Sequence, residues 1–357
     1  MSDLRLPTAI VGASGYIGQH FARLLADHPW FAPPVLVAGE RSGGRSLADV
    51  WQLVEPPPTD LADERLVQAG PAALVRRGIR IVFSALPSGL AGTFEAELVR
   101  RGVSVFSNAS DHRRDPDVAL LVPEVNAGRL VALGRPRGGR GLLVTNPNCS
   151  AAGLVVALAP VVPLLRPSAV HVSTYQALSG AGFPGVPSLT ITDNVVPYIR
   201  EEEEKVAQET ALLLGSARGR RVTPWSVPTL AHCARVGTRE GHLEAVTVVA
   251  RRRPSRAGLE RAWRAFDPLA SRGLPTAPAP PVVLRSEPDR PQPLKDRWAG
   301  APGRARGMAV SVGRVRWEPP YLRFFLLAHN AVRGGAGGSV LNAELAVSEH
   351  LLPGRGR

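Results

Sequence analysis

A glycine-spaced turn near the start of the chain constrains the fold more than any other feature. Gly12, Gly15 and Gly18 follow an apolar strand-like run, Thr8 to Val11, and precede a helical pattern from Gln19 to Asp27. Glycines at this spacing permit a tight turn and let a pyrophosphate approach the N-terminus of the following helix. At a strand–turn–helix junction the pattern predicts the dinucleotide fingerprint of a Rossmann-type domain. The residues of the turn that we expect to bind the cofactor are Gly12, Ser14, Gly15, Tyr16 and Ile17.

The end of the second strand-like run, Val35 to Ala38, indicates which nicotinamide cofactor the turn would bind. NAD enzymes often place an acidic residue there to hold the ribose 2′-hydroxyl. Here Glu40 is followed at once by Arg41 and Ser42, and a guanidinium and a hydroxyl suit a 2′-phosphate. NADP held by Arg41 and Ser42 is therefore the predicted cofactor, and Glu40 leaves NAD open. The alternative for Arg41 is a solvated loop cation.

Strand-like and helical segments alternate over residues 1–148. Further β-like runs span residues 81–85, 103–107 and 142–145. Helical segments such as Ala91 to Arg101 separate them. This alternation is typical of an α/β fold with a doubly wound parallel sheet. We predict that residues 1–148 form an NADP-binding Rossmann-type domain. A C-terminal helix within residues 330–357, with its apolar-periodic part at 342–352, is expected to return to this domain and complete it.

Residues 149–329 have a different pattern. Three β-rich runs, at 169–176, 243–250 and 321–328, are separated by long loops and a Glu-rich helix. Such a mixture predicts an α+β second domain with a mixed or antiparallel sheet. The stretch 268–306 is rich in Pro, Gly and Arg, so we expect an irregular and partly mobile loop there.

The charge balance is strongly basic, with 43 lysines and arginines against 30 acidic residues and a formal net charge of +13. Lys205 and Lys295 are the only lysines, and the arginines are scattered, without the interleaved aromatic residues that stack on bases. Together with 36 glycines and 34 prolines, this usage is typical of a GC-rich genome. We therefore predict no nucleic-acid partner and assign a few of the arginines to an anionic small substrate.

The hydropathy and the cysteines bear on the cellular compartment. No apolar run approaches the length of a membrane span, and we expect neither a membrane partner nor a signal peptide. The two cysteines, Cys149 and Cys233, are too few and too distant to form a disulfide framework. This usage indicates a reducing, cytoplasmic location.

Cys149 is the strongest candidate for a catalytic residue. It follows the run Leu142 to Thr145 and the turn at Pro147, and small residues after it open onto an Ala/Leu/Val run. The thiol is thus expected at a strand-to-helix junction, where backbone N–H groups lower the pKa of a thiol and can hold an oxyanion. The alternative is a small buried hydrophobic residue, the common role of a lone cysteine.

A catalytic thiol needs an acid–base and a group that holds the substrate. His242 comes just before a β-like run, and a neutral imidazole near a thiolate can exchange the proton of a thiohemiacetal. Gln176 ends another strand-like run and enters a Gly-rich loop, where its amide could orient an acyl group or simply hold the loop. His232 and Cys233 could be drawn with His242 as a zinc site, but no second closely spaced pair of ligands supports a metal.

Several motifs along the chain occur in an order that resembles one enzyme family. They are Asn148-Cys-Ser, Gln176-Ala-Leu-Ser-Gly, Phe183-Pro-Gly-Val-Pro-Ser, Asp193-Asn-Val-Val-Pro-Tyr-Ile, Glu202-Glu-Glu-Lys, Arg235 through His242, Arg333-Gly-Gly-Ala-Gly-Gly and Asn342-Ala-Glu-Leu. They extend over almost the whole chain and closely resemble aspartate-semialdehyde dehydrogenase of the archaeal and fungal type.

The resemblance implies NADPH-dependent reductive dephosphorylation of 4-phospho-L-aspartate to L-aspartate 4-semialdehyde, in the biosynthesis of aspartate-family amino acids. Cys149 would be the nucleophile that forms a thioacyl intermediate, His242 the acid–base, and Gln176 the residue that orients the intermediate. Arg235 would hold the substrate α-carboxylate through its planar fork, and Glu202 would meet the ammonium group. The implied phosphate ligands are Asn148, Arg113 and Lys205, and the further implied cofactor contacts are Ser88, Ser179, Gly180 and Asn342. The second domain would also form a homodimer or homotetramer.

The sequence departs from the family pattern in two places: the stretch 268–306 is longer and more basic than expected, and one loop that would touch the substrate differs. Family members usually have Arg-Val-Pro before Asp-Gly-His, whereas this chain reads Arg235-Val-Gly-Thr-Arg-Glu-Gly-His242. A specialised paralogue that reduces another acyl phosphate or an acyl-CoA therefore remains an alternative, with a malonyl-CoA reductase-like protein as the nearest rival. That rival has less use for Glu202, Arg113 and Lys205. A non-catalytic NADP-binding protein, the third alternative, would need no reactive thiol.

Overall fold

The computed structural model describes residues 5–352, which divide into two compact units. The first unit contains the chain up to Leu121, residues Gly128–Asn146 and the chain from Gly335, and the second contains Val122–Ala127 and Pro147–Gly334. The region 330–357, expected to be one helix of the first domain, is therefore divided after Gly334. Residues 353–357 of that region and residues 1–4 of the first expected domain lie outside the described chain.

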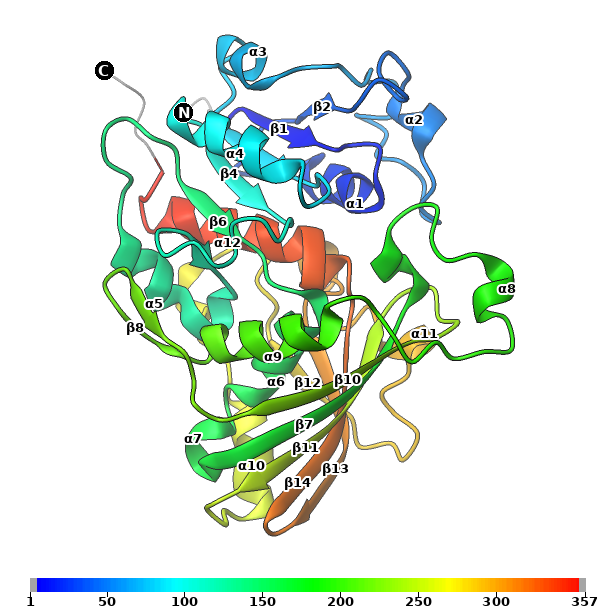
Figure 1. Cartoon of the computed structure of the whole chain (residues 1–357), viewed down its shortest axis with the longest axis vertical. Coiled ribbons are helices and arrows are strands. Elements are labelled where there is room, and N and C mark those ends of the chain that lie inside the picture. Colours follow the sequence, from blue (N-terminus) through cyan, green and yellow to red (C-terminus); the bar gives the residue numbers. More distant parts are fainter. Residues whose placement is uncertain (1–4, 353–357) are drawn as a thin grey trace. The chain divides into compact units, whose positions relative to one another are not determined.

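The first unit is built on a six-stranded sheet in the order β2-β1-β3-β4-β6-β5, with every neighbouring pair parallel (Figure 1). The strands are β1 Thr8–Val11, β2 Val35–Val37, β3 Ile81–Ser84, β4 Ser104–Ser107, β5 Ala119–Leu120 and β6 Leu143–Thr145. The predicted doubly wound parallel sheet is thus confirmed, and the short β5 is an addition to it.

Helices pack on both faces of this sheet. Helix α3 (Pro71–Arg76) and helix α4 (Ala91–Arg100) bring Leu74 and Leu98 against strand residues such as Val82. On the opposite face, Phe21 of helix α1 (Tyr16–Leu25) packs against Phe83 of β3, with their ring centroids 5.3 Å apart. The short helix α2 (Leu47–Val50) precedes α3, and α5 (Pro123–Leu133) runs from the second unit into the first.

The last helix, α12 (Gly337–Ser348), belongs to the first unit, as predicted, and contacts α1 and β4. A buried pair fastens it there, because His28 Nε2 lies 2.9 Å from Glu344 Oε1. The backbone N–H groups of Trp30 and Phe31 donate to His28 Nδ1, which leaves Nε2 as the nitrogen that donates to the carboxylate.

Two helices differ in their bounds from the sequence-based expectation. Helix α1 begins at Tyr16 rather than Gln19, because Gly15 already serves as its N-cap, and it ends at Leu25 rather than Asp27. Helix α12 begins at Gly337 and ends at Ser348 rather than spanning 342–352, since His350 has a positive φ of 54° just beyond its end. Asn342 therefore lies in the middle of α12 and not at its start.

The second unit contains a six-stranded mixed sheet in the order β10-β7-β11-β14-β13-β12. The strands are β7 Pro167–Gln176, β10 Thr229–Arg235, β11 His242–Ala250, β12 Val282–Leu284, β13 Val310–Glu318 and β14 Tyr321–Ala328. The two outer pairs are parallel and the inner pairs antiparallel, which confirms the predicted mixed sheet. A separate hairpin joins β8 (Ser216–Arg218) to β9 (Arg221–Thr223).

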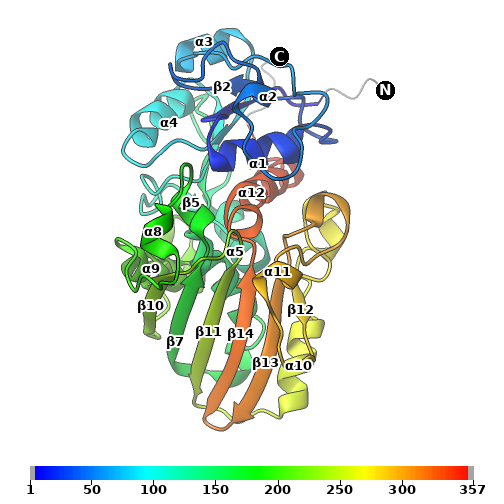
Figure 2. The same ribbon diagram turned by 90° about the vertical axis from the view of Figure 1, so that its right-hand side faces the viewer.

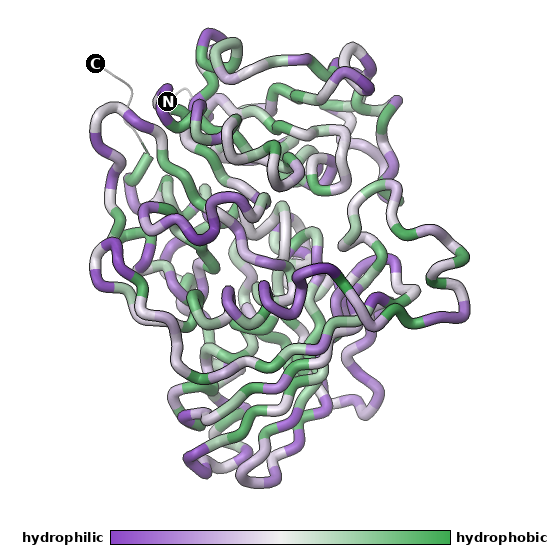
Figure 3. Tube along the Cα trace, in the orientation of Figure 1, coloured by the Kyte–Doolittle hydropathy of each residue, from purple (hydrophilic) through white to green (hydrophobic). Residues whose placement is uncertain are grey.

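Helices cover one face of this sheet and leave most of the other face bare (Figure 2). The covering helices are α6 (Cys149–Leu158), α9 (Glu202–Leu213) and α10 (Arg256–Arg264), and short turns complete the unit at α7 (Val162–Leu165), α8 (Ser188–Ile191) and α11 (Pro293–Asp296). Buried and half-buried residues alternate strictly along β11, and hydrophobic and hydrophilic residues are mixed along the strands of this sheet (Figure 3). No helix within residues 5–352 is long and apolar enough to cross a membrane.

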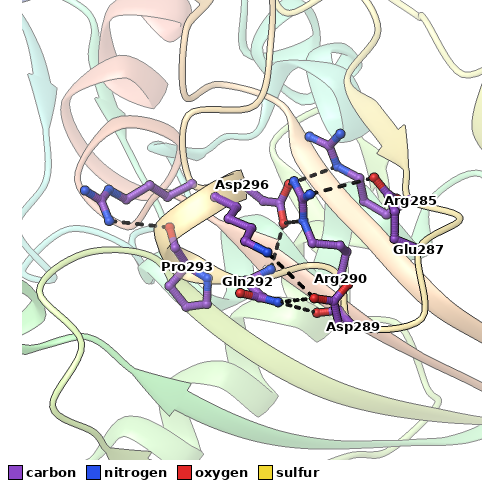
Figure 4. Close-up of polar contacts among 9 residues, drawn as sticks. Arg285, Glu287, Asp289, Arg290, Gln292, Pro293 and Asp296 are labelled. Carbon is purple, nitrogen blue, oxygen red and sulfur yellow. Dashed lines mark hydrogen bonds and ion pairs between the residues drawn. The ribbon is translucent and has the colours of Figure 1, made fainter.

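The Pro/Arg-rich stretch 268–306 is more ordered than the sequence predicted. It contributes β12, which pairs in register with β13, and it contains helix α11. The carboxylate of Asp296 is fully buried and accepts hydrogen bonds from Arg290 and from the backbone of Gln292, while Arg285 approaches to 3.1 Å (Figure 4). Most of the stretch is irregular, as expected, whereas long-range strand pairing and this buried ion-pair cluster order the part from β12 to α11.

Candidate active site

Cys149 is the first residue of α6, at the strand-to-helix junction that the sequence predicted. Asn148 is the N-cap, and its side-chain oxygen accepts hydrogen bonds from the backbone of Ser150 at 3.0 Å and of Ala151 at 3.1 Å. Residues Ser150 to Leu158 are all buried, so the apolar helix anchors its N-terminus firmly in the core of the second unit. The half-buried thiol therefore lies in the positive field of a helix N-terminus.

The imidazole of His242 faces this thiol. His242 begins β11 and is fully buried, and its Nε2 lies 3.2 Å from Cys149 Sγ. The backbone N–H of Ala177 donates to Nδ1 at 3.1 Å, so the neutral ring carries its proton on Nε2 and presents it to the sulfur. Burial, followed by the nearby charges of Arg235 and His329, lowers the pKa of His242 to about 3. The geometry therefore pairs the sulfur with a neutral imidazole donor.

Arg235 lies beside this pair at the end of β10. Arg235 is only 8% exposed, and its guanidinium donates to the carbonyl of Ala177 at 2.8 Å. Burial lowers the pKa of Arg235, against the attraction of Cys149 and Glu202. Gly180 leaves room for the guanidinium of Arg235 and the imidazole of His242. A Cβ at this position would lie 2.6 Å from Arg235 Nη1 and 3.3 Å from His242 Cε1.

Three further predicted residues form one hydrogen-bonded cluster. Glu202, in the first turn of α9, accepts hydrogen bonds from Asn148 Nδ2 at 2.9 Å and from Gln176 Nε2 at 2.8 Å. Gln176 ends β7, next to Arg235 in the register of β10 with β7. Of the four consecutive glutamates, Glu202 is the buried one, at 8% exposed. A carboxylate that meets both amides and lies near Arg235 is suited to bind an ammonium group.

Two residues that the sequence analysis missed contact the segment Asn148–Cys149. Glu209, two turns beyond Glu202 on the same face of α9, accepts a hydrogen bond from the backbone N–H of Asn148 at 2.5 Å. Gly334 passes so close to the cysteine that a Cβ there would lie 2.5 Å from Cys149 Cβ. The seven-residue spacing of Glu202 and Glu209 on one helix was a usable signal for Glu209.

In the first unit, the glycine turn has the geometry of a phosphate site. Gly12 has a φ of 83°, and a Cβ on it would meet Ala85 O at 2.7 Å; a Cβ on Gly18 would meet Gly12 O at 2.1 Å. Gly15 is the N-cap of α1 and makes no side-chain cap hydrogen bond within the described chain, and a helix N-terminus favours an anion. The residues present therefore fit a dinucleotide.

The remaining predicted residues are distributed over both units. In the first unit, Arg113 donates to Asn108 O at 2.9 Å, Ser88 accepts from Ser110, and Arg41 is exposed beside half-buried Ser42. Asn342 is buried and donates to Leu121 O at 3.4 Å. In the second unit, Lys205 pairs with Glu201 at 3.1 Å, and Ser179 accepts from Asn330 at 2.9 Å.

Comparison with known proteins assigns this arrangement to a family. The family described as "Semialdehyde dehydrogenase, NAD binding domain" matches residues 7–132, and the one described as "Semialdehyde dehydrogenase, dimerisation domain" matches residues 158–333. Aspartate-semialdehyde dehydrogenase of Archaeoglobus fulgidus is 42% identical, over 98% of this chain and 100% of its own. This chain belongs to the aspartate-semialdehyde dehydrogenase family.

Other members of the aspartate-semialdehyde dehydrogenase family agree in length and in structure. The Aspergillus fumigatus enzyme is 39% identical over 95% of this chain and 96% of its own. The structure of the Candida albicans enzyme with NADP superposes with a TM-score of 0.85 at 32% identity, covering 97% of this chain and 99% of that chain. A malonyl CoA reductase (NADP) of Metallosphaera sedula is also similar, at 36% identity over 98% of this chain and 99% of its own.

The loop in which this chain departs from the aspartate-semialdehyde dehydrogenase pattern is braced by the 268–306 stretch. Glu240, which is 5% exposed, lies 3.5 Å from Arg297 Nε and 3.6 Å from His329 Nε2. His329 in turn packs on the ring of Trp298, with centroids 4.3 Å apart. The backbone N–H of Gly241 donates to Asn330 Oδ1 at 2.9 Å. The loop before His242 and the 268–306 stretch therefore contact each other.

A buried carboxyl group and a buried thiol lie on the strands that carry His242 and Arg235. Glu244 follows His242 by two residues on the same buried face of β11, and neither of its carboxyl oxygens has a hydrogen-bond partner among residues 5–352. Burial, reinforced by the charge of Glu202, raises the pKa of Glu244 well above its usual value. Burial also raises the pKa of the Cys233 thiol to about 12, so Cys233 is no rival to Cys149 as a nucleophile.

Proposed function

We propose that this chain catalyses the NADPH-dependent reductive dephosphorylation of 4-phospho-L-aspartate to L-aspartate 4-semialdehyde, as an aspartate-semialdehyde dehydrogenase. The single observation that carries the proposal is the pairing of Cys149 Sγ with His242 Nε2 at 3.2 Å at a helix N-terminus. Family membership supplies the reaction, and this pair supplies the nucleophile that the reaction requires.

The chain's own groups account for the covalent steps. The Cys149 thiolate attacks the acyl carbon, the carbon–oxygen bond to phosphate breaks, and phosphate leaves with a proton from solvent. NADPH, when bound, supplies the hydride that reduces the thioacyl group. His242 Nε2–H first stabilises the thiolate and then the oxyanion of the thiohemiacetal, whose collapse releases the aldehyde and restores the thiolate. Gln176 orients the acyl group.

Charge complementarity supports an amino-acid substrate. Arg235 is placed to hold the α-carboxylate and Glu202 to hold the ammonium group, because they present a buried cation and a buried carboxylate beside the same thiol. We assign the phosphate to Asn148, Lys205 and Arg113. The Nδ2 group of Asn148 already donates to Glu202, so its role is to link the phosphate and ammonium subsites.

NADP is the proposed cofactor, with NAD as a weaker alternative. Gly12, Ser14, Gly15, Tyr16 and Ile17 would hold the pyrophosphate at the N-terminus of α1, and Arg41 and Ser42 the 2′-phosphate. The further contacts that we assign to the cofactor are Ser88, Ser179, Gly180 and Asn342. Of these, Gly180 borders Arg235 and His242, which supports its assignment to the region where nicotinamide and substrate would meet.

The phosphate-dependent reverse reaction tests the proposal. Purified protein, L-aspartate semialdehyde, NADP and phosphate should produce NADPH absorbance, and arsenate should replace phosphate. Equal efficiency with NAD would contradict the assignment of Arg41 and Ser42. No turnover of the semialdehyde, combined with reduction of malonyl-CoA by NADPH, would reject the aspartyl substrate.

Malonyl-CoA is included in that assay because a malonyl CoA reductase is among the similar proteins. The Metallosphaera sedula malonyl CoA reductase (NADP) is as similar to this chain as several fungal aspartate-semialdehyde dehydrogenases are. A chain with malonyl-CoA reductase activity would also use Cys149, His242 and Arg235. The buried Glu202 and its two amide partners favour the aspartyl substrate, because malonate has no ammonium group for them to bind.

The two sequence segments take different roles in this proposal. Residues 1–148, with a C-terminal contribution from residues 330–357, bind the cofactor, and residues 149–329 carry catalysis and form a homodimer or homotetramer. The matched dimerisation domain supports self-association, and the two free cysteines support action in the reducing cytoplasm.

A further inference from the structure

A pocket in the second unit lies apart from the catalytic residues and is dominated by arginine. It has a volume of about 500 Å³ and is lined by parts of α10, the end of β12 with the loop after it, and the middle of β13. Five guanidinium groups line it, against two carboxylates: Arg256, Arg264, Arg285, Arg314 and Arg316 face Glu260 and Glu287. A pocket of this size is within the range of small-molecule sites, about 300–1,000 Å³.

The neighbouring carboxylates do not balance these cations. Arg256 and Arg264 share the single carboxylate of Glu260, at 3.0 Å and 3.5 Å. Neither Arg314 nor Arg316 has an ion pair with any carboxylate among residues 5–352. The lining therefore keeps an excess of positive charge that an anionic ligand would neutralise.

The backbone around the pocket is shaped to present these side chains. The pairing of β13 with β14 is interrupted by a bulge between Gly313 and Arg316, and Arg314 has a left-handed φ of 55°. A bulge redirects side chains out of a regular strand, and strained non-glycine residues of this kind cluster at ligand sites. Gly313 permits the loop to lie against the strand, because a Cβ there would be 2.5 Å from Arg290 O.

The loop that forms one wall is fixed by its own ion pairs (Figure 4). Arg285 and Arg290 both reach the buried Asp296, at 3.1 Å and 2.6 Å. Although burial opposes its ionisation, the hydrogen bonds from Arg290 and Gln292 and the charge of Arg285 lower the pKa of Asp296. The carboxylate thus stays charged and holds the wall in place, so the pocket is preorganised.

From these observations we infer that the pocket binds a compact polyanion, of three or more negative charges, built from phosphate or carboxylate groups. Guanidinium forks match both kinds of oxyanion. No aromatic side chain lines the pocket, so a nucleobase has no stacking partner there. The site is independent of the proposed catalysis, because none of its lining residues belongs to the catalytic cluster.

Calorimetric titration of the NADP-saturated protein with tripolyphosphate, and separately with citrate, tests the inference and distinguishes the two sources of anion. The double variant R314N/R316A should weaken binding of the preferred anion by about tenfold or more, as expected for two lost charged contacts. Asn tolerates the left-handed backbone at position 314. The matched control R218A/R221A, which removes two exposed arginines from the β8–β9 hairpin, should change affinity by less than about twofold.

A second variant, E260Q, keeps the inference testable if R314N/R316A does not fold. E260Q removes a competing carboxylate and should strengthen binding of the same anion by at least about twofold. Failure of both anions to bind the wild type, an equal loss in the pocket variant and the control, or no response to E260Q and R314N/R316A would each overturn the inference. These readouts do not depend on turnover, so they remain valid whatever the substrate of the catalytic site.

Discussion

Single side chains along β11 have their protonation states fixed by backbone neighbours and by burial. The N–H of Ala177 occupies Nδ1 of His242, and burial keeps the ring neutral. Two residues later, Glu244 is kept protonated by the same lack of solvent and by the charge of Glu202. Near Cys149, this strand therefore contributes two titratable groups whose uncharged forms are favoured by burial.

Replacing each cysteine by serine should have different effects on activity. C149S should reduce kcat in the phosphate-dependent reverse assay by a factor of about 10⁴ or more, because the nucleophile is lost while cofactor binding remains. C233S, the matched control, should retain kcat within about threefold, since that thiol is 2% exposed and stays protonated. A comparable loss in both variants would contradict the assignment of Cys149.

The unpaired carboxyl of Glu244 predicts a pH-dependent stability. The unfolded chain loses this proton above its ordinary pKa of 4.5, while the folded chain keeps it, so folding becomes less favourable as pH rises. E244Q removes the effect and should gain up to about 1.4 kcal/mol over the wild type per pH unit above that value, until the folded group also ionises. Chemical denaturation from pH 4 to 8 measures the difference. Parallel stability curves would show that Glu244 is ionised in the fold.

Some of these residues were open to prediction from the sequence and others were not. Cys149 and His242 carry distinctive chemistry in recognisable motifs, and the structure brings them together. The N–H of Ala177 and the backbone of Gly334 leave no such mark, because their importance comes from a backbone approach that only the folded chain creates. Glu244 was equally hidden, since a glutamate in an alternating strand gives no sign that it faces inward without a partner.

Segments of secondary structure position these side chains across long sequence distances. The stretch 268–306 adds β12 to the edge of the second sheet and brings Arg297 to Glu240, in the loop before His242. Trp298 packs on His329, which also lies close to Glu240. We expect this brace to hold the His242 loop in place, since Gly237 stands where the family pattern has a proline.

Removing the brace should slow catalysis without removing a catalytic group. R297A leaves the buried Glu240 without its guanidinium and should lower kcat by about tenfold to a hundredfold, with little change in the KM for NADP. K295A, two residues away with an exposed side chain, should behave like the wild type. Steady-state kinetics measure kcat for both variants. Equal kcat values would show that the stretch has no part in positioning His242.

Strand prediction succeeded where the hydrophobic pattern was continuous and failed where it was not. The apolar runs of β1, β3 and β14 were plain in the sequence. In contrast, β10 contains His232, Cys233 and Arg235, and β13 has arginines at its bulge. These strands are stabilised by pairing with β7 and β14, a long-range effect that local periodicity does not contain.

For the complete chain, the bare face of the second sheet is the most consequential surface. Half-buried residues alternate along β11, and Ala245 lies between Ser173 of β7 and Phe325 of β14 on that face. Tyr175 and Leu230 are exposed nearby, at 40% and 52%. An extensive sheet face of this kind is typical of a protein interface.

A charge at the centre of this face should disrupt assembly. A245R places an unpaired guanidinium in the proposed interface and should convert the dimer or tetramer into monomers, as measured by size-exclusion chromatography with light scattering. The control A217R adds the same charge on the exposed β8–β9 hairpin and should leave the mass unchanged. A wild type that runs as a monomer would reject self-association through this sheet.

The contrast between the two sulfur atoms has a practical consequence. Each chain offers one half-buried thiol at a helix N-terminus and one thiol that is buried and held in its protonated, unreactive form. Brief alkylation near neutral pH should therefore mark each subunit once. The amount of label incorporated then counts the functional subunits in a preparation, and a fluorescent or isotopic tag can be installed beside the substrate without engineering the sequence.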